Sequence, residues 1–538
     1  MKKSVENTGA SRLVLDRRMF LALSSIALFP ASIATAAPGV LVIALDIADT
    51  VTLDPARMGT YTPALTLHTA YETLVTMAPG DYVNVKPNLA ETFERTPGDD
   101  GWRFTLRQGV TFASGNPLTA ADVKFSIDRM INIKDQPSGY ARTVDRIEIV
   151  DDKTIDVFTK DPNDPILTVL CSPQAGIVDS KVVAENGGSA ALDADTADTA
   201  TKWLNGNSAG SGPYQVKGWE RNGQIVLEQN PNYWNGTPAY KRIVITHIPE
   251  SGSQLLAVRR GEVDVAFNLT PEQLKSLAGD AEVEVVRTLS QDWTYISLNG
   301  NPEINEFLAK REARLAVAHA IDYDGIRDSL VDGAATRAAN YISVGIGGST
   351  EEQTKEIGYH DDLEKAKDLL KQAGLPDGFS FPLQYPTGVF GGVPYQLLAQ
   401  KIQADLARVG INAELQPMDS VMLRTLFKAG KSPAFINYFN PPAVEPLLNA
   451  EAAFLRGAQR AGWDIPAEIG EIAIKASRTR DLEQQAALYK EFTIKLQEEG
   501  HFIILFQPYY QVAVRKDVTD FALTGAGWFA ELAPSSRK

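Results

Sequence analysis

The segment Gly206–Gly210 has the sequence G-N-S-A-G and matches G-x-S-x-G, the pattern around the nucleophilic serine of many hydrolases. In those enzymes the serine sits on a sharp turn between a strand and a helix, and this turn holds the oxyanion donors in place. Here residues 185–212 are polar and rich in small residues, which predicts a surface loop with one weak helix, and a strand follows at Pro213. This order argues against Ser208 as a nucleophile. An exported serine hydrolase remains the alternative from another class.

Other chemistry that depends on clustered residues has little support. The five histidines are scattered, without an H-E-x-x-H motif or a Cys/His spacing that would hold zinc: His68, His247, His319, His360 and His501. The chain also has no phosphate-binding loop of the form G-x-x-x-x-G-K-[ST], and no G-x-G-x-x-G opens a helix after a strand. We therefore expect no catalytic residues, no metal site and no cofactor, and we expect His319 and the single cysteine, Cys171, to be buried structural residues.

The N-terminus has the features of an export signal. Basic residues precede a short apolar stretch, and the small-residue site Ala34-Thr35-Ala36 follows it. The pair Arg17-Arg18 resembles a twin-arginine signal, although an ordinary secretory signal with two arginines remains the alternative. We predict that residues 1–36 are a signal peptide and that the mature protein is in the periplasm.

Charge and composition narrow the function classes further. The chain has 538 residues, 44% of them apolar, and a formal net charge of −15. Removal of residues 1–36 takes away five positive and two negative charges, which moves the net charge to −18. Nucleic acid is a polyanion, so it is an improbable partner. No apolar run after the N-terminus is long enough to cross a bilayer, which predicts a soluble mature protein.

Local patterns predict the elements of the first half of the chain. Alternating apolar residues at 102–106 are typical of a half-buried strand. Thr119 and Asp122 have the spacing of a capping box, and apolar residues at helical spacing follow them. Asn222-Gly223 lies between two alternating runs, which predicts a β-hairpin over 213–229.

The second half has the pattern of an α/β region. Apolar residues recur every three or four positions in 362–374 and 395–410, and Gly374 and Gly410 stand where helix C-terminal caps belong. Residues 501–516 are a nearly continuous β run, which would allow the C-terminus to join a sheet begun much earlier in the chain.

Several segments together resemble the family 5 solute-binding proteins of ABC importers, the dipeptide, oligopeptide and nickel receptor group. They occur in the family's order and span nearly the whole mature chain: TLDPARM at 52–58, the run at 87–130, GSGPYQVKGW at 210–219, LEQNPNYWNGTPAYKRIVI at 227–245, LLAVRRGEVDVAF at 255–267, REARLAVAHAIDYDGI at 311–326 and EKAKDLLKQAG at 364–374.

The resemblance implies an α/β, two-lobed periplasmic-binding-protein fold (type II, cluster C) with an extra subdomain in the first lobe. The expected first lobe covers 37–293 with an inserted subdomain at about 81–209. The second lobe covers 294–507, and 508–538 return to the first lobe. The ligand of such a protein lies between the lobes, which close around it by a hinge motion.

The same resemblance places candidate ligand-binding residues. Trp293 and Tyr295 lie on one strand face near the expected lobe crossing, with ordinary core packing as the alternative. Tyr61 follows the Leu-Asp-Pro turn and is a further candidate wall residue. Arg142 offers a planar guanidinium for a ligand carboxylate, with a surface position as the alternative.

One tract departs from the peptide receptors of the family. Their pattern W-x-x-D-Y-x-D-P supplies an aspartate for the ammonium group of the peptide. The corresponding tract, NYFNPPAVEP at 437–446, has Phe439 in place of the tryptophan and Pro442 in place of the aspartate. A buried ammonium group needs a counter-charge, so the change favours a modified peptide, an opine, an oligosaccharide or another polar solute. Tyr438, Asn440 and Glu445 are the candidates in this tract.

The resemblance implies a substrate-binding protein, not an enzyme, that captures a peptide or peptide-like solute and delivers it to the permease subunits of an ABC importer. We expect the receptor to be a monomer, and nickel is disfavoured by the sparse histidines. A receptor that mainly signals to a membrane sensor is a further alternative.

Overall fold

The structure is a computed structural model that describes residues 39–60, 62–339, 341–390, 393–441 and 443–538. The predicted signal peptide, Tyr61 and Pro442 lie outside the described residues.

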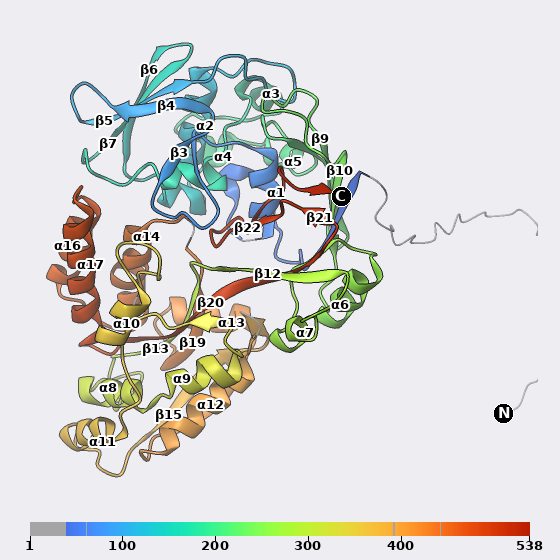
Figure 1. The fold of residues 1–538 in the computed structure, drawn as a ribbon. Coiled ribbons are helices and arrows are strands. Elements are labelled where there is room, and N and C mark those ends of the chain that lie inside the picture. The colour runs from blue at the N-terminus through green and yellow to red at the C-terminus, as the bar shows by residue number, and fades with distance from the viewer. Residues whose placement is uncertain (1–38, 61, 340, 391–392, 442) are drawn as a thin grey trace, which may run out of the picture. The chain divides into compact units, whose positions relative to one another are not determined.

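A twelve-stranded sheet connects the two halves of the described chain (Figure 1). Its strands follow the order β18 (Asn412–Met418), β15 (Ser380–Pro386), β19 (Ala434–Phe439), β13 (Trp293–Leu298), β20 (Phe502–Arg515), β11 (Val265–Ala266), β1 (Val40–Leu45), β10 (Arg242–His247), β9 (Gln224–Gln229) and β8 (Tyr214–Glu220). Two further strands, β12 (Val283–Leu289) and β14 (Ala335–Thr336), also pair with β20.

Strand β20 belongs to both parts of this sheet. Its first residues pair with β13, where Phe506 lies opposite Thr294. Its later residues pair with β12, where Tyr509 lies opposite Leu289, and with β11. The C-terminal β run therefore does join strands from much earlier in the chain, as its sequence suggested. The lobe boundaries near 293 and 507 remain a prediction.

A four-stranded antiparallel sheet lies in the first half, in the order β4 (Ala90–Arg95), β5 (Gly101–Leu106), β7 (Thr154–Thr159) and β6 (Val144–Asp151). The strand predicted at 102–106 is confirmed as β5. Helix α2 (Ala120–Asn132) begins at the predicted capping box, in which the side chains of Thr119 and Asp122 satisfy backbone N–H groups of the first turn.

The helices of the described chain have the following bounds: α1 Thr62–Ala70, α3 Ser180–Glu185, α4 Ala194–Ala197, α5 Thr201–Leu204, α6 Ser251–Arg260, α7 Pro271–Lys275, α8 Arg311–Ala320, α9 Tyr323–Gly325, α10 Glu351–Ile357, α11 Leu363–Gln372, α12 Tyr395–Ala407, α13 Ser420–Lys428, α14 Pro446–Glu451, α15 Ala458–Arg460, α16 Ala467–Ser477 and α17 Leu482–Gln497. Gly374 and Gly410 have positive φ angles of 72° and 84° just beyond α11 and α12, which confirms the predicted caps. The predicted loop at 185–212 contains two short helices, α4 and α5, where one weak helix was expected.

The glycine-rich segment before the hairpin packs tightly against the end of α1. A Cβ atom on Gly210 would lie 2.1 Å from the carbonyl oxygen of Ala70, and one on Gly212 would lie 2.7 Å from the same oxygen. Strands β8 and β9 then form the predicted hairpin, with Asn222 in the turn at a φ of 56°. These two glycines are therefore required by close backbone approach.

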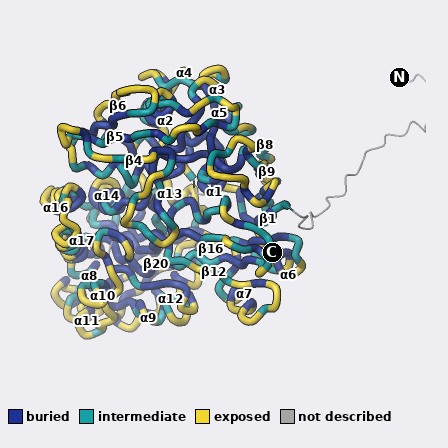
Figure 2. Tube along the Cα trace, turned by 45° about the horizontal axis from the view of Figure 1, so that its top comes forward, coloured by how far each residue is buried: buried dark blue, intermediate teal, exposed yellow. Residues whose placement is uncertain are grey.

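Buried residues follow the sheet strands, and the outer helices such as α11 and α16 carry much of the exposed surface (Figure 2). His319 and Cys171 are buried, as predicted. In the part of the chain that the structure describes, no helix is both long and apolar enough to cross a membrane.

Candidate functional site

The crossing between the two halves of the sheet is built on a cluster of aromatic rings. Trp293 and Phe439 face each other across β13 and β19, and their rings stack at 4.7 Å. The Trp293 ring also contacts Tyr341 at 4.3 Å and Tyr295 at 5.3 Å. Trp293 is 0% exposed and Tyr295 is buried, so both pack in the core in this structure. Trp293 Nε1 has no hydrogen-bond partner among the described residues, which leaves one buried donor in the cluster.

A small cavity of about 30 Å³ lies beside this cluster, at the tract that departs from the peptide receptors. Segments far apart in the sequence line it: Met58, Gly59, Thr60, Ala64, Gln136, Tyr140, Pro173, Gln174, Asn440, Pro441 and Gly527. Its volume is enough for a water molecule. The buried Thr60 Oγ1 and Gln174 Oε1 have no hydrogen-bond partner among the described residues. The cavity therefore offers unsatisfied polar atoms from one half of the chain opposite Asn440 from the other.

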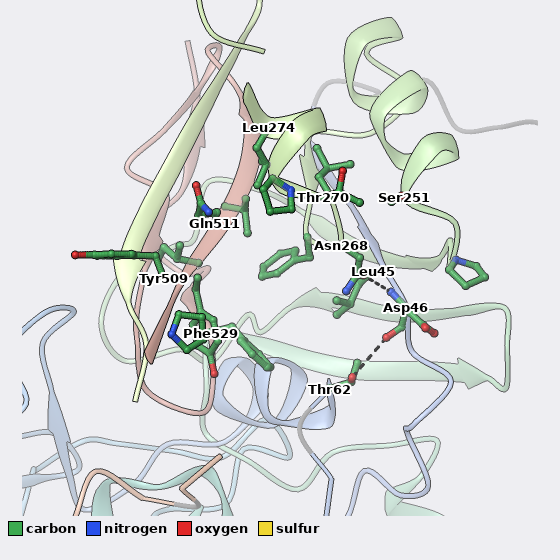
Figure 3. Close-up of a pocket in the computed structure, with 18 residues that line it drawn as sticks. Leu45, Asp46, Thr62, Ser251, Asn268, Thr270, Leu274, Tyr509, Gln511 and Phe529 are labelled. Carbon is green, nitrogen blue, oxygen red and sulfur yellow. Dashed lines mark hydrogen bonds between the residues drawn. The ribbon is translucent and has the colours of Figure 1, made fainter. Parts of the chain in front are cut away.

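A larger cavity of about 490 Å³ lies between β20 and the first-half elements (Figure 3). Polar residues such as Asp46, Asn268 and Gln511 line it together with aromatic rings. The ring of Phe529 lies 5.2 Å from that of Tyr510, and both residues line the cavity. This mixture of aromatic walls and a few polar groups is typical of sites that enclose a polar small molecule.

The backbone of Phe529 supports a functional role for this wall. Its φ angle is 67°, a left-handed conformation that a bulky residue adopts rarely and at an energetic cost. The neighbouring Gly527 lines the small cavity, so one C-terminal turn borders both cavities.

A buried polar network separates the two cavities. The Tyr510 hydroxyl donates to Asp292 Oδ2 at 2.7 Å, and Asn440 Nδ2 donates to the Tyr510 hydroxyl at 3.1 Å. Tyr510 lines the larger cavity and Asn440 lines the smaller one. Asp292 is only 2% exposed and has no ion-pair partner among the described residues. The network thus places an uncompensated carboxyl group at the crossing of the two halves.

The environment of Asp292 disfavours its charged form. Burial raises its pKa to about 7, while hydrogen bonds from Tyr510 and Asn440 act in the opposite direction. Asp292 itself lines neither cavity, but its partners Tyr510 and Asn440 do. A buried carboxyl group with a pKa near neutrality beside a cavity is a common feature of functional sites. Asp292 was not among the site residues predicted from the sequence, although a carboxylate directly before the buried strand β13 was a signal that could have pointed to it.

Glu445 makes two structural contacts. Its Oε1 accepts from the backbone N–H of Leu447 at 3.0 Å and thereby caps α14, and its Oε2 accepts from the Thr168 hydroxyl at 2.7 Å. The carboxyl group is buried, and burial raises its pKa to about 7. Glu445 therefore joins the second half to the segment around Thr168 and does not line either cavity.

Substitution of Glu445 by glutamine is expected to change how stability depends on pH. The folded protein holds a proton on Glu445 up to about pH 7, whereas the unfolded chain releases it near pH 4.5. Stability from this group is therefore lost as the pH rises from 4.5 to 7, by about 3 kcal/mol in all. Urea unfolding of E445Q should show a smaller decrease over this range than the wild type. The exposed Glu471→Gln serves as the control, and identical pH profiles for E445Q and the wild type would contradict the prediction.

Arg142 and Tyr438 also have partners within the protein. Arg142 forms an ion pair with Glu451 of α14, and its side chain is 40% exposed. Tyr438 is half-buried and hydrogen-bonds with Arg424. Burial raises the pKa of the Tyr438 hydroxyl, and the nearby carboxylates of Asp292 and Asp49 act in the same direction. Tyr438 therefore lies near acidic groups from the first half of the chain.

Two further features bear on the chemistry considered from the sequence, namely metal ligands and Ser208. No group of three His, Cys, Asp or Glu side chains there is arranged to hold a metal ion. Ser208 Oγ accepts the backbone N–H of Val216 at 3.0 Å, within the hairpin that follows it. The Ser208 hydroxyl oxygen thus contacts a backbone amide of the hairpin.

In this two-lobed α/β fold the small cavity lies where the predicted lobes meet, whereas the larger cavity is lined by residues of the predicted first lobe, including its C-terminal return at 508–538. Such a fold defines a solute-binding protein, and comparison with known proteins agrees. The model for bacterial extracellular solute-binding proteins, family 5 (middle), matches residues 84–454. The chain belongs to this family, which confirms the family and the fold expected from the sequence.

Two curated relatives and a solved structure illustrate the likeness. The chain is 27% identical to the "Probable D,D-dipeptide-binding periplasmic protein DdpA" of Escherichia coli strain K12, over 95% of this chain and 96% of that protein. It is 26% identical to "Di/tripeptide-binding protein 2" of Pseudomonas aeruginosa, over 88% and 90%. The periplasmic binding protein DppA of Helicobacter pylori, solved with the peptide STSA, superimposes with a TM-score of 0.74 at 23% identity, over 93% and 98%.

Proposed function

We propose that this protein is the periplasmic substrate-binding component of an ABC importer, and that it encloses a peptide or peptide-like solute between its two halves. The observation that carries the proposal is the buried network in which Asp292 and Tyr510 of the predicted first lobe meet Asn440 of the second, beside the small cavity that residues of both lobes line. The larger cavity adjoins this network through Tyr510. The export signal predicted at 1–36 supports the location, and the names of the relatives, which include dipeptide and tripeptide binders, support the ligand class.

Within this site we assign Asp292 to the positive group of the ligand. The usual aspartate position of the peptide receptors holds Pro442, so the counter-charge has to come from another segment. Asp292 hydrogen-bonds with Asn440, two residues before Pro442, and has no cationic partner among the described residues. A carboxylate held by two neutral donors can accept an ammonium group without losing an existing ion pair. The buried aromatic cluster begins at Trp293, the residue that follows Asp292.

Protein recovered from the periplasm should carry or bind dipeptides. We expect mass spectrometry of the released ligand to show peptides or amino-acid conjugates. Calorimetry on the ligand-free protein should then show dipeptide binding. A dipeptide at a hundred times its Kd should raise the free energy of unfolding by about 2.7 kcal/mol, because it binds the folded state alone.

Free alanine is the control, since it offers the same end groups without a second residue. Release of oligosaccharides alone, together with no calorimetric signal from any dipeptide, would contradict the peptide assignment. Ester or amide hydrolysis that disappears in Ser208→Ala would contradict the assignment to a binding protein.

A further inference from the structure

Three arginines gather in the second half of the chain on two neighbouring elements. Arg424 lies on α13, and Arg456 and Arg460 lie on the helical run formed by a π-helical stretch, Ala452–Gly457, and α15. Arg456 and Arg460 are four residues apart, which is the spacing that brings side chains together on a helix. The Arg460 guanidinium lies 5.7 Å from the ring centre of Phe427, which follows Arg424 by three residues on α13. We call Arg424, Arg456 and Arg460 the arginine cluster.

The arginine cluster is electrostatically unfavourable by itself. Like charges four residues apart destabilise a helix. Burial lowers the pKa of Arg460, and the positive charges of Arg456 and Arg424 lower it further. The π-helical turn that contains Arg456 is a rare local geometry that occurs often at functional sites.

The cluster also lacks compensating acidic groups. Among the described residues, none of its members forms an ion pair with a carboxylate, although the chain has a net charge of −15. Two arginines that lie in or near this part of the fold are paired: Arg142 contacts Glu451, which lies five residues before Arg456, and Arg478 contacts Asp164 at 3.0 Å. Arg424 and Arg456 are exposed and Arg460 is half-buried, so the cluster is a positive patch that is open to a partner from outside the chain.

The cluster borders the candidate site. Arg424 hydrogen-bonds with Tyr438, two residues before Asn440. Burial raises the pKa of Tyr140, which lines the small cavity from the other half of the chain, and the nearby charge of Arg456 acts in the opposite direction. The charge of Arg460 acts in the same way on Tyr295 of the aromatic cluster. Of these tyrosines, Tyr140 lines the small cavity, whereas Tyr438 lies on β19 two residues before Asn440 and Tyr295 lies on the paired strand β13.

We infer that the arginine cluster receives an anionic group that the ligand carries in addition to one carboxylate end, so that the solute carries carboxylate or phosphate groups in excess of its positive charge. This inference rests on the proposed function and names the class of solute. Guanidinium groups match the planar oxygens of carboxylate and phosphate with paired hydrogen bonds. A cationic patch in a largely anionic protein also attracts anionic solutes to the site, and between low-dielectric walls the attraction is strengthened.

The test compares three dipeptides that differ in the side chain of the second residue: Ala-Ala, Ala-Glu and Ala-phosphoserine. We expect the wild-type protein to bind at least one of the two acidic dipeptides at least tenfold more tightly than Ala-Ala in calorimetry at 50 mM salt. The double substitution R456Q/R460Q should remove this preference and leave the affinity for Ala-Ala within about twofold. The matched control is R221Q/R242Q, which removes two exposed first-half arginines on the β8–β9 turn and β10.

A second readout separates ligand binding from a structural role. In the ligand-free state, R456Q/R460Q should unfold at the same temperature as the wild type or at a higher one, because the substitution removes repulsion between like charges. A structural role for the cluster would instead lower the unfolding temperature. An unfolding temperature clearly below that of the wild type, or an equal loss of affinity for Ala-Ala and the acidic dipeptides, would overturn the inference.

The arms of the experiment distinguish failure of the inference from failure of the proposed function. If Ala-Ala binds as tightly as both acidic dipeptides, the peptide receptor stands and the inference falls. If no dipeptide binds but the N-(1-carboxyethyl) derivative of alanine, an opine, binds in a manner that requires Arg456 and Arg460, the inference stands and the peptide assignment falls. If none of the four probes binds, both fall. The acidic dipeptide that binds more tightly identifies the anionic group as carboxylate or phosphate.

Discussion

Replacing Arg129 with methionine is expected to lower the free energy of unfolding by about 3–5 kcal/mol. Arg129 is 1% exposed and lies between two buried carboxylates. Its Nη1 and Nη2 donate to Asp54 at 2.7 Å each, and its Nε and Nη2 donate to Asp198 at 2.8 and 2.9 Å. R129M keeps most of the side-chain volume but leaves Asp54 without a cation and Asp198 with Arg57 alone, at 3.8 Å. A buried unpaired charge is strongly destabilising.

Urea unfolding at pH 7 measures this effect. The control is Arg260→Met, because Arg260 is exposed and its distance to Glu262 is 3.8 Å, so its contribution to stability is about 0–1 kcal/mol. The triple variant D54N/R129M/D198N should recover part of the lost stability, since it removes the unpaired charges as well. A loss of less than 1 kcal/mol in R129M would show that Asp54 and Asp198 become protonated or solvated at little cost.

Replacing Asp292 with asparagine is expected to weaken binding of a dipeptide with a free amino end by about a hundredfold, which is about 2.7 kcal/mol. The substitution preserves the shape of the side chain and an oxygen for the Tyr510 hydroxyl, so the fold should persist. What it removes is the negative charge that we assign to the ammonium group of the ligand. Calorimetry with Ala-Ala on both proteins measures the loss, and N-acetyl-Ala-Ala, which has no ammonium group, should bind both proteins alike.

The same assignment predicts how binding depends on pH. The pKa of Asp292 is about 7 in the ligand-free protein, so below pH 7 the carboxyl group has to lose its proton before it can pair with an ammonium group. Wild-type affinity for Ala-Ala should therefore fall by up to tenfold for each pH unit below 7, and D292N should lose this dependence. Equal pH profiles for D292N and the wild type would exclude Asp292 as the counter-charge.

Local elements were predictable because their signals lie within a few residues. The capping box at Thr119 and Asp122, the hairpin turn at Asn222 and the glycines that end α11 and α12 are all present in the structure. In each case one backbone conformation or one short hydrogen bond decides the element, so the sequence carries the whole signal.

The glycine-rich segment is an example in which neighbouring residues predict only part of the structure. The order of loop and strand was enough to argue against Ser208 as a nucleophile. The reason for Gly210 and Gly212, however, is the carbonyl oxygen of Ala70, about 140 residues earlier in the chain, and only the folded structure brings it there. Arg142 and Glu445 are similar, since Glu451 and Thr168 belong to distant segments. The sequence was enough to select Arg142 and Glu445 as candidates, but it did not predict which residues they contact.

The sequence by itself determined the family, the order of most elements and the absence of the usual aspartate in the tract at 437–446. Tertiary structure decided which residues meet at the candidate site. Asp292 and Tyr510 are 218 residues apart, and Asn440 joins them only because β13, β19 and β20 cross between the halves of one sheet. The arginine cluster depends in the same way on the packing of two helical elements. Periodicity and capping act over a few residues, whereas burial and charge balance depend on contacts between segments that no local pattern encodes.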